Sequence, residues 1–124
     1  MKHIPLFLCL FITISANSQV NLNLGLKAYY PFSGNANDVS GNNNNPVFNN
    51  ATLTADRQGN SNSAYHFNGT DNYMKVLNSP SLNMSNQMSI SLWMKATGFY
   101  TGPCYNNMLL MKGDADYLPG NYFL

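Results

Sequence analysis

Short apolar runs separated by turn-forming residues constrain the fold of this chain more than any other feature of its sequence. No window of helical length keeps an uninterrupted period of about 3.6 residues, and clusters of Gly, Asn, Ser, Asp and Pro divide the runs. Short alternating runs bounded by such clusters are typical of β-strands in sandwiches and barrels. The sequence therefore predicts an all-β fold.

Several segments carry the strand pattern, in which every second side chain lies on the same face. They are Leu24–Phe32, Ser63–Asn68, Tyr73–Leu77, Met88–Lys95, Met108–Lys112 and Asn121–Leu124. Met88–Lys95 is the clearest of them, because its apolar side chains alternate with two serines and Trp93. In Leu24–Phe32 the apolar face is predicted to include Tyr30, with Lys27 and Tyr29 on the opposite face. We expect Ser33–Asn45 to form a long, turn-rich loop.

A turn signal separates two of these segments. Asn68–Asn72 reads Asn-Gly-Thr-Asp-Asn, and such residues tolerate the left-handed backbone angles of a hairpin turn. We therefore expect Ser63–Asn68 and Tyr73–Leu77 to pair as an antiparallel hairpin.

The beginning of the chain has the three parts of a secretory signal peptide. Lys2 precedes an apolar run over Ile4–Ile14, and small residues at Ala16 and Ser18 form a cleavage site before Gln19. The run is shorter than the about 20 apolar residues that a membrane anchor needs. We expect residues 1–18 to be removed, and the mature protein to be secreted or held at the cell surface.

Removal of the signal leaves an uncharged chain. The whole sequence has six Lys and Arg residues against five Asp and Glu, so the loss of Lys2 leaves five of each sign. A neutral chain lacks the basic surface that binds nucleic acid. No second long apolar segment follows the signal, so we expect no membrane span. With 44% hydrophobic residues, the chain has the material for a core.

Four phrases of the sequence occur in an order that resembles a known family. They are GLKAYYPF at 25–32, GNANDVSGN at 34–42, AYHFNG at 64–69 and MSISLWMK at 88–95. In this order and spacing they resemble the laminin-G-like jelly-roll domains of the concanavalin A-like lectin and glucanase superfamily. The resemblance extends from Gly25 to about Lys112.

The resemblance implies an antiparallel jelly-roll sandwich of two sheets, used outside the cell as one module of a larger multidomain protein. Domains of this family are longer than the mature chain. Residues 19–124 would then be the N-terminal part of one domain, truncated at its C-terminal end. We expect such a fragment to leave sheet edges unpaired and to fold poorly by itself.

No arrangement of residues in this sequence indicates an enzyme. The family members that cleave β-glucans use a pair of carboxylates on one strand, and this chain contains no Glu. Its closest acidic pair, Asp114 and Asp116, follows Gly113 and reads as a turn. His66 lies within a predicted strand and has no nucleophile motif nearby. A catalytic domain outside this chain remains open.

Calcium is the candidate cofactor. Ca²⁺ binds several carboxylate, amide and carbonyl oxygens, and the loop at 35–42 offers Asn37, Asp38 and Asn42. The resemblance implies the same, because calcium is often bound at loops of this sandwich and Asp38 matches a repeated acidic position. Asp71, in the Asn68–Asn72 turn, is a second candidate ligand. The alternative is that Asp38 caps a turn by accepting hydrogen bonds from its own backbone.

The loop at 97–107 is the candidate ligand-binding surface. It presents Phe99, Tyr100 and Tyr105 among glycines and a proline, and aromatic rings are platforms for sugars. Trp93 is expected to pack in the core instead. Cys104 is the only cysteine left after signal cleavage, so we expect it to form a disulfide with a partner outside this chain.

These observations predict a non-catalytic binding module that recognises carbohydrate or an extracellular protein. Two alternatives remain open, because the same sandwich serves many functions. One is an ancillary domain of a secreted glycoside hydrolase or other hydrolase whose catalytic part lies elsewhere. The other is a structural or adhesin spacer without a small ligand.

Overall fold

The computed structural model describes residues 21–99, 101, 107–113 and 122–124. The strands are β1 (Pro46–Asn49), β2 (Thr52–Thr54), β3 (Ala64–His66), β4 (Met74–Val76), β5 (Met111–Lys112) and β6 (Tyr122–Phe123). A single turn of 3₁₀ helix, η1 (Pro80–Leu82), is the only helical element among the described residues. The predicted all-β class is therefore confirmed.

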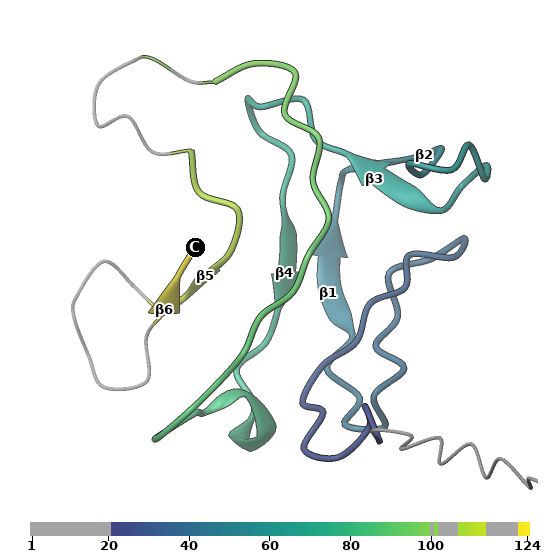
Figure 1. Cartoon of the computed structure of the whole chain (residues 1–124). Coiled ribbons are helices and arrows are strands. Elements are labelled where there is room, and N and C mark those ends of the chain that lie inside the picture. The colour runs from purple at the N-terminus through teal and green to yellow at the C-terminus, as the bar shows by residue number, and fades with distance from the viewer. Residues whose placement is uncertain (1–20, 100, 102–106, 114–121) are drawn as a thin grey trace, which may run out of the picture.

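The strands form three antiparallel ladders of two strands each, β1 with β4, β2 with β3, and β5 with β6. Figure 1 shows β1 and β4 side by side in the centre, with the β2–β3 hairpin on one side and the β5–β6 pair on the other. Within the described residues these ladders do not join into two continuous sheets. The antiparallel character is established, and the jelly-roll sandwich stays a prediction.

The predicted hairpin between Ser63–Asn68 and Tyr73–Leu77 is wrong, although both segments contain a strand. β3 pairs with β2, with Leu53 opposite Tyr65, and β4 pairs with β1. Asn50 provides the physical reason. Its side-chain oxygen accepts a hydrogen bond from the Tyr73 N–H at 2.8 Å, and its amide donates to the Asp71 carbonyl at 3.1 Å. The turn is therefore attached to the residue after β1, and it directs β4 toward β1.

Two of the predicted strands form no ladder among the described residues. In Leu24–Phe32 the backbone of Tyr29 bonds to the loop that follows, donating to the Asp38 carboxylate and accepting from the Val39 N–H. The predicted alternation is present from Leu26 to Tyr30, where Tyr30 is half-buried and Lys27 exposed, but Leu24 at the start of the segment is 85% exposed. Met88–Lys95 is assigned to no strand or helix, and no backbone hydrogen bond joins it to another described residue.

No apolar side chain in the described part of the chain is fully buried. Aromatic rings contact one another here, with Phe32 stacked at 6.2 Å from Tyr30 and edge-on to Tyr65 at 5.2 Å. Phe32 adopts a φ of 57°, a left-handed conformation that is unusual for a bulky residue. The residues that are buried are polar, Asp38 and Asn44. The expected hydrophobic core is therefore replaced, in these residues, by a polar centre.

The predicted strands Met108–Lys112 and Asn121–Leu124 are confirmed in shorter form as β5 and β6, which pair with each other. Leu124 extends this ladder, because its N–H and carbonyl both bond to Leu110. In the described residues, no helix has the length and apolar character needed to cross a membrane.

Candidate functional site

The loop after residue 32 is organised around the carboxylate of Asp38, which is 9% exposed. One oxygen accepts the N–H groups of Tyr29 and Ser40, each at 2.9 Å. The other accepts the Ser40 hydroxyl and the Asn44 N–H, also at 2.9 Å each. The Asp38 N–H in turn donates to the Asn45 side chain at 2.8 Å. One short acidic side chain thus fixes the path of the whole loop.

These hydrogen bonds also set the charge state of Asp38. Burial by itself raises the pKa of this carboxyl, because it disfavours the charged form. The N–H groups of Tyr29, Ser40 and Asn44, with the Ser40 hydroxyl, favour the charged form more strongly. The pKa of Asp38 is therefore lowered below its usual value of 3.8, and the loop contains a carboxylate at neutral pH.

Four consecutive asparagines, residues 42–45, have different structural roles. Asn42 donates its amide to the Leu26 and Lys27 carbonyls from an exposed position. Asn43 provides a left-handed backbone turn, with a φ of 57°. Asn45 accepts the Asp38 N–H, as described above. Asparagine suits each role, because it tolerates positive φ and both donates and accepts hydrogen bonds.

Asn44 is the most buried of the described residues, at 3% exposure. Its amide donates to the Lys27 carbonyl at 2.8 Å and to the Ser81 hydroxyl at 2.9 Å. Its side-chain oxygen accepts the Ser79 hydroxyl at 2.7 Å, and its carbonyl accepts the Tyr30 hydroxyl at 2.7 Å. We call Asp38 and Asn44, together with the residues that they bond to, the polar hub; these residues are Lys27, Tyr29, Tyr30, Ser40, Asn45, Ser79 and Ser81. The polar hub joins the first segment, the loop and η1.

The polar hub does not fit a resident calcium ion. Both Asp38 oxygens already accept two hydrogen bonds each, whereas Ca²⁺ would need them as ligands. The Asn42 amide donates to the Leu26 and Lys27 carbonyls, and the Lys27 carbonyl also accepts the Asn44 amide, so this carbonyl is occupied by donors and not by a cation. The Asn37 N–H bonds to the Asn35 side chain in a local turn. The geometry supports the turn-capping alternative for Asp38.

Asp71 belongs to a separate turn. Asn68 organises this turn, because its side-chain oxygen accepts the N–H groups of Thr70, Asp71 and Asn72 at 3.0 to 3.2 Å. The Asn68 amide donates to the Asp71 carboxylate at 2.7 Å. Asp38 and Asp71 share no hydrogen-bond partner, so the structure does not bring these two candidate ligands together. Among the described residues no group of three or more His, Cys, Asp or Glu is placed to hold a metal.

Trp93, the most exposed aromatic residue among those described, contacts Arg57. Trp93 is 79% exposed, in contrast to its expected place in the core. The guanidinium carbon of Arg57 lies 4.0 Å from the centre of the Trp93 ring, a cation–π contact. Arg57 comes from the loop between β2 and β3, and Trp93 from the extended segment 88–95. We call this pair the Trp93–Arg57 platform.

Asp56, the residue beside Arg57, bonds to the backbone and side chains of its own loop and forms no ion pair with Arg57. Asp56 accepts the Gln58 and Asn60 N–H groups and the Asn60 amide, each at 2.9 Å. The Asn60 amide, followed by the backbone donors of the loop, lowers the pKa of Asp56. No ion pair or hydrogen bond involves Arg57 within the described residues. Its N–H donors are therefore available at the surface.

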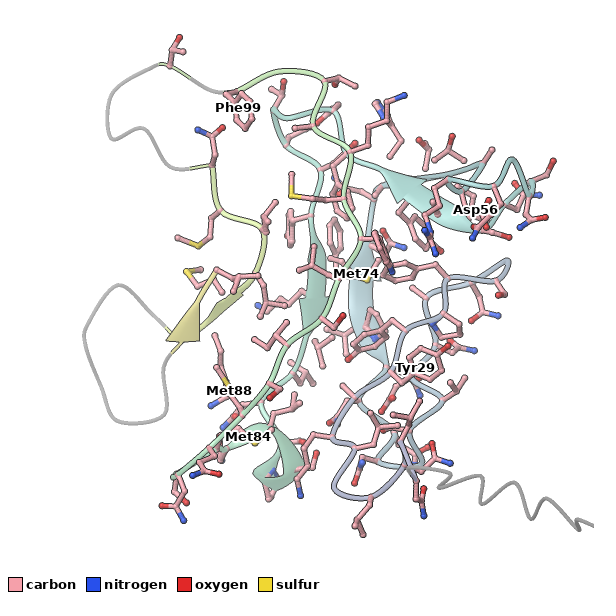
Figure 2. The ribbon with its side chains drawn as sticks, viewed as in Figure 1. Tyr29, Asp56, Met74, Met84, Met88 and Phe99 are labelled. Carbon is pink, nitrogen blue, oxygen red and sulfur yellow. The ribbon has the colours of Figure 1, made fainter. Side chains whose placement is uncertain are left out.

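The structure places the other predicted ligand residues as follows. Phe99 is 71% exposed, and Figure 2 shows it away from Asp56 and the β2–β3 loop. Tyr100, Tyr105 and Cys104 lie outside the described residues. A second aromatic pair, Phe48 and Tyr73, stacks across β1 and β4 with ring centres 4.5 Å apart. Each of these two is about half exposed, at 41% and 51%.

Sequence reasoning missed Arg57 and gave Trp93 the opposite role. The strand pattern places Trp93 opposite the apolar face of its segment, and this position was the one sequence signal that Trp93 could be exposed. Arg57 is the only arginine of the chain, in a loop without other cations, and its partner is known only from the fold. The chain matches no protein-family profile, no curated protein and no solved structure.

Proposed function

We propose that this chain is a non-catalytic, extracellular carbohydrate-binding module whose contact surface is the Trp93–Arg57 platform. The observation that carries the proposal is the exposure of Trp93. A tryptophan side chain costs free energy when it is left in water, and it is an apolar plane of the size of a sugar ring. Arg57 lies over one face of the Trp93 ring, and Trp93 is 79% exposed, so the other face of the ring is open to a ligand.

The neighbouring structure supports a binding role for this surface. The loop that presents Arg57 is ordered by Asp56, which bonds to three donors of Gln58 and Asn60. A pre-ordered loop loses less conformational entropy when it binds, so more of the contact energy appears as affinity. The platform therefore combines an aromatic plane, a free cation and a fixed loop, which are the elements of a polar ligand site.

The wider context of this proposal comes from the sequence. The signal-like residues 1–18 support export, and the four family-like phrases support a laminin-G-like jelly roll that belongs to a larger extracellular protein. The sequence contains few acidic residues and no Glu, and this supports a binding function rather than glycoside hydrolysis, which needs a pair of carboxylates. Determination of the first residue of the secreted protein by mass spectrometry tests the export step, with Gln19 expected.

Binding to a panel of immobilised glycans tests the function. We expect Trp93→Ala to weaken binding to every recognised glycan by about tenfold or more, because truncated aromatic anchors dominate binding energies. Leu24→Ala is the matched control, since Leu24 is 85% exposed and lies in another segment. Absence of binding to any glycan would refute the proposal and favour a structural spacer. Equal binding by the wild type and Trp93→Ala would show that the binding site does not include Trp93.

A further inference from the structure

We infer that the Trp93–Arg57 platform selects sugars that bear a carboxylate, namely the uronate residues of an acidic polysaccharide. This inference rests on the proposed function and adds the ligand class. It follows from the juxtaposition of an open aromatic face with a cation that has no anionic partner among the described residues.

The chemistry of Arg57 determines this preference. A guanidinium presents five N–H donors in a planar fork, which matches the two oxygens of a carboxylate. The Trp93 ring faces the Arg57 guanidinium, and no other described residue accepts a hydrogen bond from its N–H groups. A carboxylate at these N–H groups would gain charge-assisted hydrogen bonds, which are stronger than those to a neutral hydroxyl. A neutral sugar would gain the stacking contact alone.

A second cation lies on the same segment as Trp93. Lys95 lies two residues after Trp93 in the same segment, which belongs to no ladder. Lys95 is exposed. A polymer of uronates presents its carboxylates at regular intervals, and Arg57 and Lys95 can each meet one. This second contact favours a polysaccharide over a single acidic sugar.

The net charge of the whole chain does not contribute to this selectivity, which depends on the cations at the platform. After loss of the signal the formal charge is zero, so no broad positive field attracts polyanions to the surface. Attraction of an acidic polymer therefore depends on the few cations at the platform. An acidic peptide would also meet Arg57, but it lacks the apolar ring face that stacks on Trp93.

The test measures binding of the full chain to alginate, polygalacturonate and hyaluronan, each beside its carboxyl-reduced counterpart. Reduction replaces the carboxylate by a primary alcohol and keeps the ring and linkage. We expect at least one of the three to bind at least about tenfold more tightly than its reduced form, since hydrogen bonds to charged groups are the stronger ones. We expect Arg57→Gln to remove this difference and Arg57→Lys to restore part of it.

Each outcome distinguishes the inference from the function on which it rests. Equal affinity for charged and reduced forms, with both lost in Trp93→Ala, refutes the uronate preference and leaves carbohydrate binding intact. An Arg57→Gln effect of the same size on both forms also refutes it. Binding to polyglutamate as tight as to the polyuronates would reassign the platform to acidic peptides. No binding to any polysaccharide overturns both proposals.

Discussion

Replacement of Asn44 by alanine should open the polar hub. The side chain of Asn44 satisfies three groups, the Lys27 carbonyl and the hydroxyls of Ser79 and Ser81, at 2.7 to 2.9 Å. At about 1 kcal/mol of net stabilisation for each group, the free energy of opening the loop falls by about 3 kcal/mol. Because about 1.4 kcal/mol corresponds to a factor of ten, the amides that bond to Asp38 should exchange with solvent about 100-fold faster.

Amide hydrogen exchange followed by NMR measures this directly, at the N–H groups of Tyr29 and Ser40. The matched control is Asn43→Gly in the same run of asparagines. Asn43 has a φ of 57°, which glycine adopts without strain, so this change should leave exchange within about threefold of the wild type. A change below about threefold in Asn44→Ala, or equal acceleration in both variants, would refute the assignment of Asn44 as the centre of the hub.

Three further predictions concern the polar hub and the turn before β4. Because the pKa of Asp38 is lowered in the folded loop, its carboxylate stabilises the loop fully above pH 3.8, and this stabilisation is lost as the pH falls through the lower folded pKa. The N–H chemical shifts of Ser40 and Asn44 should therefore titrate with a midpoint below 3.8 in the wild type and should not titrate in Asp38→Asn. A higher midpoint would contradict the lowered pKa. Removal of calcium with a chelator should leave those shifts unchanged, since the Asp38 oxygens are already occupied by donors; a shift that calcium restores would establish the metal site. Asn50→Ala should speed exchange of the Tyr73 N–H by about fivefold, because the loss of its 2.8 Å hydrogen bond costs about 1 kcal/mol, and an unchanged rate would refute the role assigned to Asn50 in holding the turn before β4.

The sequence pattern located strands better than it located their partners. Alternating residues between turn signals correctly placed β3 and β4, because a strand pattern is local. The choice of partner depends on Asn50, whose side chain binds the turn before β4 across 23 residues. Nothing in the pattern distinguishes this asparagine from the many others in the chain. Pairing was therefore predictable as antiparallel, but not as β1 with β4.

In the candidate site, too, the sequence predicts local turn structure but not the contacts between residues that are far apart in the chain. Asp38 was recognisable as a turn former or a ligand, and only the four donors around it favour the first role. The run at 42–45 gives no indication that Asn44 is buried while Asn42 is exposed, because that difference arises from contacts with Ser79 and Ser81. For Trp93, alternation gives the face of the segment and not whether another element covers that face.

Trp93 is the only tryptophan of the chain, so its fluorescence reports on the platform alone. Titration of the full chain with a uronate oligosaccharide tests the central claim most directly. Stacking of a sugar ring removes water from the exposed indole, so we predict a saturable shift of the emission to shorter wavelength. The dissociation constant from this titration should equal the one measured by calorimetry. Saturable binding by calorimetry with no change in Trp93 emission, and with full retention of affinity in Trp93→Ala, would contradict the account.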